Sequence, residues 1–156
     1  MQGKVRSWDS FAQKWEVMTG PCSYWVDAAS GVFHDEQTVI DDETDEKQHI
    51  RSFQLWVGVS EKDRSKPPSI QTGMSLPTFE CKSSDGEVVG TGRYHVGAQT
   101  SITTPHPVQV AHIKQQASTV YKYPIPLDHG GFVVHMHGEA SYGGTSVSEE
   151  NSVVVL

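Results

Sequence analysis

Apolar residues in this chain occur in short runs that Gly, Pro, Ser and Asp repeatedly interrupt. This spacing predicts many strands joined by turns rather than long helices. Residues 53–59 alternate in a strand-like way, which predicts a buried strand with Phe53 and Leu55 on one face and Trp56 on the other. We expect these three side chains to belong to the core rather than to a substrate site.

Three later segments have the same strand-like character: residues 108–113, 131–136 and 153–156. The Gly pairs at 130–131 and 143–144 are expected to supply the positive φ angles that tight hairpins require. The pattern therefore predicts an all-β protein, with a Greek-key or jelly-roll sheet as its architecture.

The composition changes between Glu61 and Pro77, where Lys, Asp, Arg, Ser and three prolines predominate. Because proline has no N–H to donate, this stretch cannot pair as an interior strand. We interpret residues 61–78 as a Pro-rich linker between a first domain in residues 1–60 and a second in residues 79–156.

Charge narrows the range of functions. The 156-residue chain has 12 Lys and Arg against 19 Asp and Glu, a net charge of -7. The basic residues are dispersed, which argues against direct contact with nucleic acid. The acidic run 41–46 has almost nothing apolar to bury and lacks the ligand pattern of an EF-hand, so we expect an exposed loop rather than a calcium site.

Targeting and cysteine signals are absent from the sequence. The first residues form no apolar signal region and no window is long and apolar enough for a membrane span, so we expect no membrane association and a cytoplasmic or nuclear location. Cys22 and Cys81 lie far apart in the chain and form no CxxC motif. They therefore indicate neither a zinc site nor a disulfide framework, and a reducing compartment fits best.

Two stretches carry a family resemblance. Residues 25–36 read WVDAASGVFHDE, and residues 53–57 read FQLWV, followed by Lys62-Asp63 and Pro67-Pro68. In order and spacing they resemble the pirin family. Weaker collinear matches continue downstream, at Thr104-Pro105, Tyr123-Pro124-Ile125-Pro126, Gly138-Glu139 and Gly143-Gly144. The resemblance extends from about Trp15 onward.

The resemblance implies a fold and a metal site. Pirins are bicupins, two tandem jelly rolls, and the first holds one iron bound by three His and one Glu. His34 and Glu36 match the family's His-x-Glu element. The family's earlier His-x-His element has no counterpart here, so the resemblance implies an incomplete Fe(II) site and a chain truncated at both ends, with parts of both cupins.

Elementary chemistry is compatible with this implied pair. Residues i and i+2 of a strand point to one face, so both His34 and Glu36 can face a barrel interior. An imidazole nitrogen and a carboxylate oxygen suit ferrous iron. Two ligands hold a metal poorly, however, and the open alternative is a hydrogen-bonded pair in a strand.

Other histidines offer weaker alternatives. His135 and His137 form a His-x-His on one strand, but they come later than the position at which cupins keep their ligands, and the second cupin of pirins binds no metal. We expect an ordinary surface or barrel-lining pair. His106, between Pro105 and Pro107, is expected to be a turn residue.

Two functional hypotheses follow. The first is an iron-binding pirin-like cupin protein with quercetin 2,3-dioxygenase activity, in which Glu36 also accepts a substrate proton, or with a role as an iron-dependent transcriptional coregulator. The second is a truncated, metal-free interaction module. An incomplete jelly roll leaves open sheet edges, so this second hypothesis predicts self-association or binding to protein partners.

Overall fold

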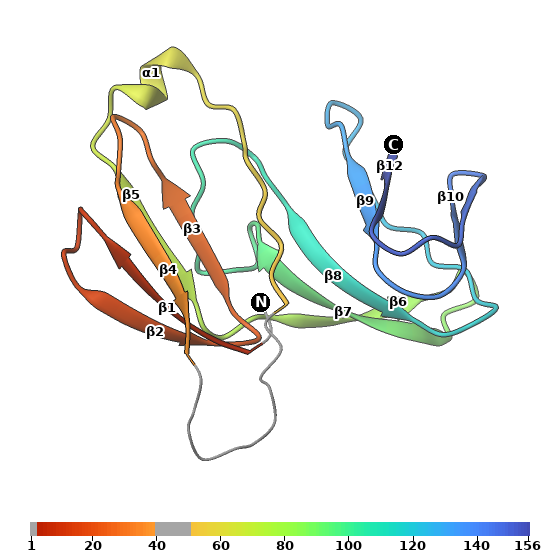
Figure 1. Cartoon of the computed structure of the whole chain (residues 1–156). Coiled ribbons are helices and arrows are strands. Elements are labelled where there is room, and N and C mark those ends of the chain that lie inside the picture. The colour runs from red at the N-terminus through yellow and green to blue at the C-terminus, as the bar shows by residue number, and fades with distance from the viewer. Residues whose placement is uncertain (1–2, 40–50) are drawn as a thin grey trace. The chain divides into compact units, whose positions relative to one another are not determined.

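The computed structural model describes residues 3–39 and 51–156, and its regular secondary structure is almost entirely antiparallel β-strand (Figure 1). The predicted all-β class is confirmed. Contacts within the chain divide it into two compact units, residues 1–121 and 122–156, which are described separately below. The acidic run at 41–46 lies outside the described residues.

The first sheet of the first unit has the strand order β2-β1-β4, with β1 (Lys4–Asp9) between β2 (Trp15–Thr19) and β4 (His34–Thr38). Every second residue of β1 is buried, as the period of a strand requires: these are Val5, Ser7 and Asp9. Val5 packs with the buried Met18 and Cys22, and Tyr24 packs against this cluster. These side chains form the hydrophobic core beside the first sheet.

The opposite face of this sheet is polar and aromatic. The guanidinium of Arg6 lies 4.8 Å from the centre of the Trp15 ring, and its Nε and Nη2 donate to Gln37 Oε1 at 3.0 and 2.5 Å. Trp8 and Trp15 are direct cross-strand partners. This face is in contact with solvent, because both Arg6 and Trp15 are exposed.

A second sheet pairs β3 (Ser23–Asp27) with β5 (Ser69–Gly73). The segment predicted as a linker, residues 61–78, thus contains β5 and a short helix, α1 (Glu61–Arg64), whose N-cap is Ser60. The prolines lie before and after β5, so none of them occupies a hydrogen-bonded position of its ladder with β3. The role of this segment as a connection between two domains stays a prediction.

The third sheet has β7 (Val88–Val96) between β6 (Thr78–Lys82) and β8 (Val110–Gln115). The strand predicted at 108–113 is confirmed by β8. Both ladders of β7 contain a register shift, one at Cys81/Lys82 and one at Tyr94/Val96. Such bulges increase the local twist and redirect the side chains beside them.

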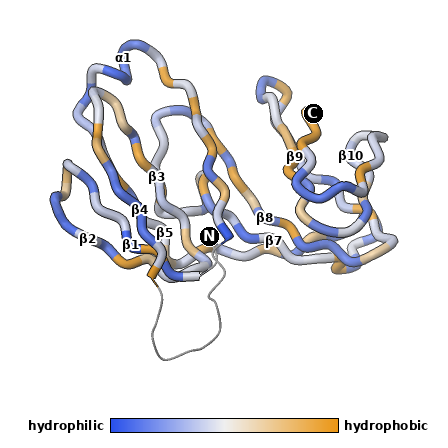
Figure 2. Tube along the Cα trace, in the orientation of Figure 1, coloured by the Kyte–Doolittle hydropathy of each residue, from blue (hydrophilic) through white to orange (hydrophobic). Residues whose placement is uncertain are grey.

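The second unit consists of two separate hairpin-like sheets. β9 (Phe132–His135) pairs with β12 (Ser152–Val155), and β10 (Ala140–Tyr142) pairs with β11 (Thr145–Val147). The strands predicted at 131–136 and 153–156 are therefore confirmed. In Figure 2 the apolar character of β9 and of the C-terminal strand stands out within this unit.

Of the two predicted glycine turns, only one has the expected backbone. Gly143 and Gly144 join β10 to β11 with φ angles of 56° and 90°, the conformation of a two-residue hairpin turn. Gly130 and Gly131 are not among the residues with positive φ, so the prediction was wrong there.

The strand predicted at 53–59 is not formed. These residues pair with no neighbouring strand in the described structure, and Phe53 and Trp56 are 56% and 86% exposed. The placement of these two side chains in the core was therefore wrong, whereas Leu55 is half-buried. Alternation favours a strand, but a strand also needs a partner whose N–H and C=O groups are available.

Candidate functional site

His34 and Glu36 lie on β4, two residues apart, and both are exposed. Across the ladder with β1, His34 is opposite Asp9 and Glu36 is opposite Ser7. Directly opposite residues share one face of an antiparallel sheet. The imidazole and the carboxylate therefore emerge on the side of the sheet that carries the buried core, as members of one short row.

Tyr24 of β3 adds a phenol to this side of the sheet. Its hydroxyl accepts a hydrogen bond from Ser7 Oγ at 3.3 Å. Burial raises the pKa of Tyr24, and the nearby carboxylates, Glu36 among them, raise it further. The phenol therefore stays protonated at neutral pH, with a proton available for donation.

The Asp9 side chain accepts hydrogen bonds from the turn that follows β1. Its Oδ1 accepts the backbone N–H groups of Phe11 and Ala12 at 2.9 and 2.5 Å, and the carboxylate is almost completely buried. A carboxylate at the end of a strand commonly caps the following turn in this way. The sequence reasoning missed Ser7, Asp9 and Tyr24. The two-residue spacing of Ser7 and Asp9 was the available signal for those two.

His34 and Glu36 are ligand types that suit iron, but two ligands are too few to hold it. Within residues 3–39 and 51–156, no group of three or more His, Cys, Asp or Glu side chains is placed to hold a metal ion. Stable sites need three or four ligands supported by further hydrogen bonds. His34 and Glu36 fit as two ligands and do not form a complete site by themselves.

In the His-x-His pair of the second unit, the first histidine, His135, has a structural role. His135 is 2% exposed, its Nδ1 lies 3.0 Å from the Tyr142 hydroxyl, and its Nε2 lies 2.9 Å from the Gly138 carbonyl oxygen. Because a carbonyl only accepts, Nε2 carries the proton and Nδ1 accepts from the tyrosine. Both nitrogens are thus engaged within the fold. His137 is exposed, with Nδ1 2.7 Å from Glu150.

His106 forms a tertiary contact that its place between two prolines did not predict. Its Nε2 lies 3.3 Å from Oδ2 of Asp63, a buried residue of α1. Hydrogen bonds from Lys66 and then Ser60 lower the pKa of Asp63 to about 2, so this carboxylate is ionised at neutral pH. The contact links α1 to the loop before β8, and we interpret its role as structural.

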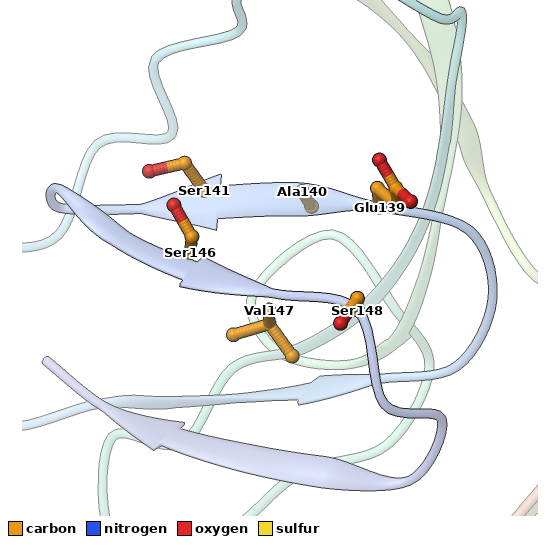
Figure 3. A pocket seen from close by; sticks show the side chains of 6 residues that line it. All are labelled: Glu139, Ala140, Ser141, Ser146, Val147 and Ser148. Carbon is orange, nitrogen blue, oxygen red and sulfur yellow. The ribbon is translucent and has the colours of Figure 1, made fainter.

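A hollow of about 350 Å³ lies on the β10–β11 hairpin (Figure 3). It is lined by Glu139, Ala140, Ser141, Ser146, Val147 and Ser148. Its polar groups are hydroxyls and one carboxylate, without a histidine or cysteine to ligate a transition metal or act as a nucleophile. The hollow therefore offers no alternative catalytic centre.

No helix in the described part of the chain has the length and apolar character that crossing a membrane demands.

Comparison with known proteins gives two relatives, although no family model matches the chain. A Pseudomonas aeruginosa protein named "Putative quercetin 2,3-dioxygenase" is 28% identical over 160 aligned residues, covering 95% of this chain and 52% of that protein. A "Pirin-like protein" of Arabidopsis thaliana is 23% identical over 148 residues, covering 94% of this chain and 46% of that protein. The chain spans about half the length of these curated relatives.

Proposed function

Because this chain is related to the pirin family and its antiparallel all-β architecture fits a cupin jelly roll, we propose that it is an Fe(II)-binding cupin protein with activity of the quercetin 2,3-dioxygenase type. One observation carries the proposal. His34 and Glu36 lie on the same face of β4 and both are exposed, so an imidazole nitrogen and a carboxylate oxygen are available to one ion.

The site needs further donors. The described residues supply two of the three or four ligands that hold iron stably, so the others come from outside the described residues or from another chain. Bound Fe(II) would supply open coordination positions for oxygen and the flavonol. The resemblance also implies a role as an iron-dependent coregulator in the nucleus. That role needs the same ion, so the measurement of iron content described below tests it as well.

The chain's own side chains have defined tasks in this proposal. Glu36 accepts a proton from a flavonol hydroxyl, as an exposed carboxylate beside the bound substrate can do. Tyr24, which stays protonated, donates a hydrogen bond to an oxygen of the substrate on the same side of the sheet. Ser7, which donates to the Tyr24 hydroxyl, holds the phenol in place.

Iron binding is expected to depend on His34. After anaerobic reconstitution with ferrous iron and desalting, His34→Ala should retain at most about a tenth of the iron of the unmodified protein, because losing one of few ligands weakens a site strongly. Metal content is measured by elemental analysis, and oxygen uptake with quercetin is measured in parallel.

His129→Ala is the matched control, since His129 is exposed in the second unit, where its Nδ1 contacts the adjacent Asp128. This variant should bind as much iron as the unmodified protein. Equal iron content in the His34 variant and the unmodified protein, or negligible iron in both, would overturn the proposal.

A second candidate function, a metal-free interaction module, is favoured by the exposed apolar face of the β9–β12 sheet. Val155 is paired with Phe132 and Val153 with Val134, so these side chains share one face. Phe132, Val153 and Val155 are 44%, 60% and 81% exposed. This two-stranded sheet has no further strand at either edge within the described residues, and open edges favour pairing with a second copy.

This second candidate predicts a dimer or larger assembly at micromolar concentration in sedimentation velocity. Val153→Glu should shift the distribution toward monomer, because a carboxylate on the shared face cannot be buried at low cost. Val120→Glu, at a 70% exposed valine of the first unit, is the control and should leave the distribution unchanged. A purely monomeric profile of the unmodified protein contradicts the module hypothesis and leaves the iron proposal standing.

A further inference from the structure

An arginine and two histidines lie close together where β7 and β8 pair, near the bulge in their ladder. Arg93 of β7 is directly opposite His112 of β8, so the two side chains share a face of the sheet. His95 follows at the register shift between Tyr94 and Val96, a geometry that redirects its side chain. None of these three residues belongs to the sheet that carries His34 and Glu36.

His95 is anchored from the neighbouring sheet. Its Nδ1 lies 2.9 Å from the hydroxyl oxygen of Ser23, a buried residue at the start of β3. When the Ser23 hydroxyl donates to Nδ1, the ring proton lies on Nε2. The imidazole is then held in one orientation and keeps one N–H donor for a ligand.

Within residues 3–39 and 51–156, no acidic side chain forms an ion pair with Arg93, His95 or His112. Arg93 is half-buried and forms no ion pair with a carboxylate among the described residues. The acidic residue on the same face of the sheet, Glu80, is already 3.4 Å from Lys82 Nζ. In a chain with a net charge of -7, an unneutralised and partly buried guanidinium is an uncommon arrangement.

The electrostatic environment is positive at both imidazoles. Burial lowers the pKa of His95 to about 4, and the charges of His112 and Arg93 contribute to the decrease. Partial desolvation of the ring also lowers the pKa of His112, and the positive charges of Arg93 and Arg51 lower it further. Both rings are thus neutral at pH 7, and the guanidinium of Arg93 is the charged donor that acts on both of them.

We propose that Arg93, His95 and His112 form a binding site for the phosphate or carboxylate group of a small anionic ligand. A guanidinium presents parallel N–H donors that match an oxyanion, and the neutral imidazoles add one donor each. Partial burial strengthens the attraction by reducing solvent screening. This site goes beyond the proposed iron chemistry and does not depend on it.

Isothermal titration calorimetry at low salt and pH 7, with inorganic phosphate in one arm and malonate in the other, tests the proposal. At least one anion should bind, and the arm that saturates identifies the ligand group. Arg93→Gln should weaken binding about tenfold or more, because it removes the charged donor. His112→Gln, at an exposed position where folding is not at risk, should weaken binding several-fold.

Lys114→Gln is the matched control. Lys114 is exposed on β8, two residues from His112 and opposite Thr91, and its loss changes the net charge by the same amount as Arg93→Gln. It should alter the dissociation constant less than twofold. Failure of both anions to bind the unmodified protein, or equal weakening by the Lys114 and Arg93 variants, would show a general charge effect and overturn the proposed site.

NMR gives a readout that a merely structural role would not change. Saturation with the anion should raise the pKa of both His95 and His112, since a bound negative charge favours the protonated ring. Unchanged imidazole titration at saturating anion would also overturn the proposal.

Discussion

Replacing Met18 by alanine is expected to lower the free energy of unfolding by about 2–5 kcal/mol, the range for large-to-small changes in a core. Met18 is 1% exposed and packs with Val5 and Cys22 beneath Tyr24. Few side chains in the described structure are buried this completely, so little apolar packing exists to compensate for the cavity. The measurement is equilibrium unfolding in urea. An unchanged m-value would show that the substitution alters stability and not the unfolding mechanism.

Val17→Ala is the control for this experiment. Val17 is the neighbouring residue of β2, points to the opposite face and is 56% exposed. Its truncation should cost less than about 0.5 kcal/mol, as expected for an exposed site. Similar losses in the two variants would mean that the cluster of Val5, Met18 and Cys22 is not the main core of this region.

Replacing Gly92 by alanine is expected to destabilise the β6–β7–β8 sheet by about 1–3 kcal/mol through overpacking. A Cβ at this position would lie 1.9 Å from Cζ of Phe79, far inside van der Waals contact. The Phe79 ring is stacked on Tyr94 with 4.4 Å between ring centres, so it cannot move away without losing that contact. The shift of the unfolding midpoint measures the effect.

A double-mutant cycle separates this clash from other effects of the substitution. In a Phe79→Leu background the added methyl group has more room, so Gly92→Ala should cost less than it does beside the intact ring. Gly58→Ala is the control, because a Cβ at Gly58 has no heavy atom within 4 Å. If the cost of Gly92→Ala were the same in both backgrounds, the close approach to Phe79 would not be its cause.

The sequence predicted those elements whose signal is local. Strand-like alternation located β8, β9 and β12, and a pair of glycines located the turn between β10 and β11. The two-residue spacing of His34 and Glu36 was sufficient to expect them on one face of a strand, since the strand period fixes the side to which each residue points. Their role as metal ligands stays a prediction.

Features that depend on distant parts of the chain were decided by tertiary structure alone. Residues 53–59 have the alternation of a strand but meet no partner, whereas 69–73 form β5 despite the flanking prolines because β3 lies beside them. The proposed anion site likewise combines Arg93 and His112 from two separate strands, with His95 held by Ser23 of a third. Strand pairing and charge clustering are set by which segments meet in space, and no local pattern encodes that meeting.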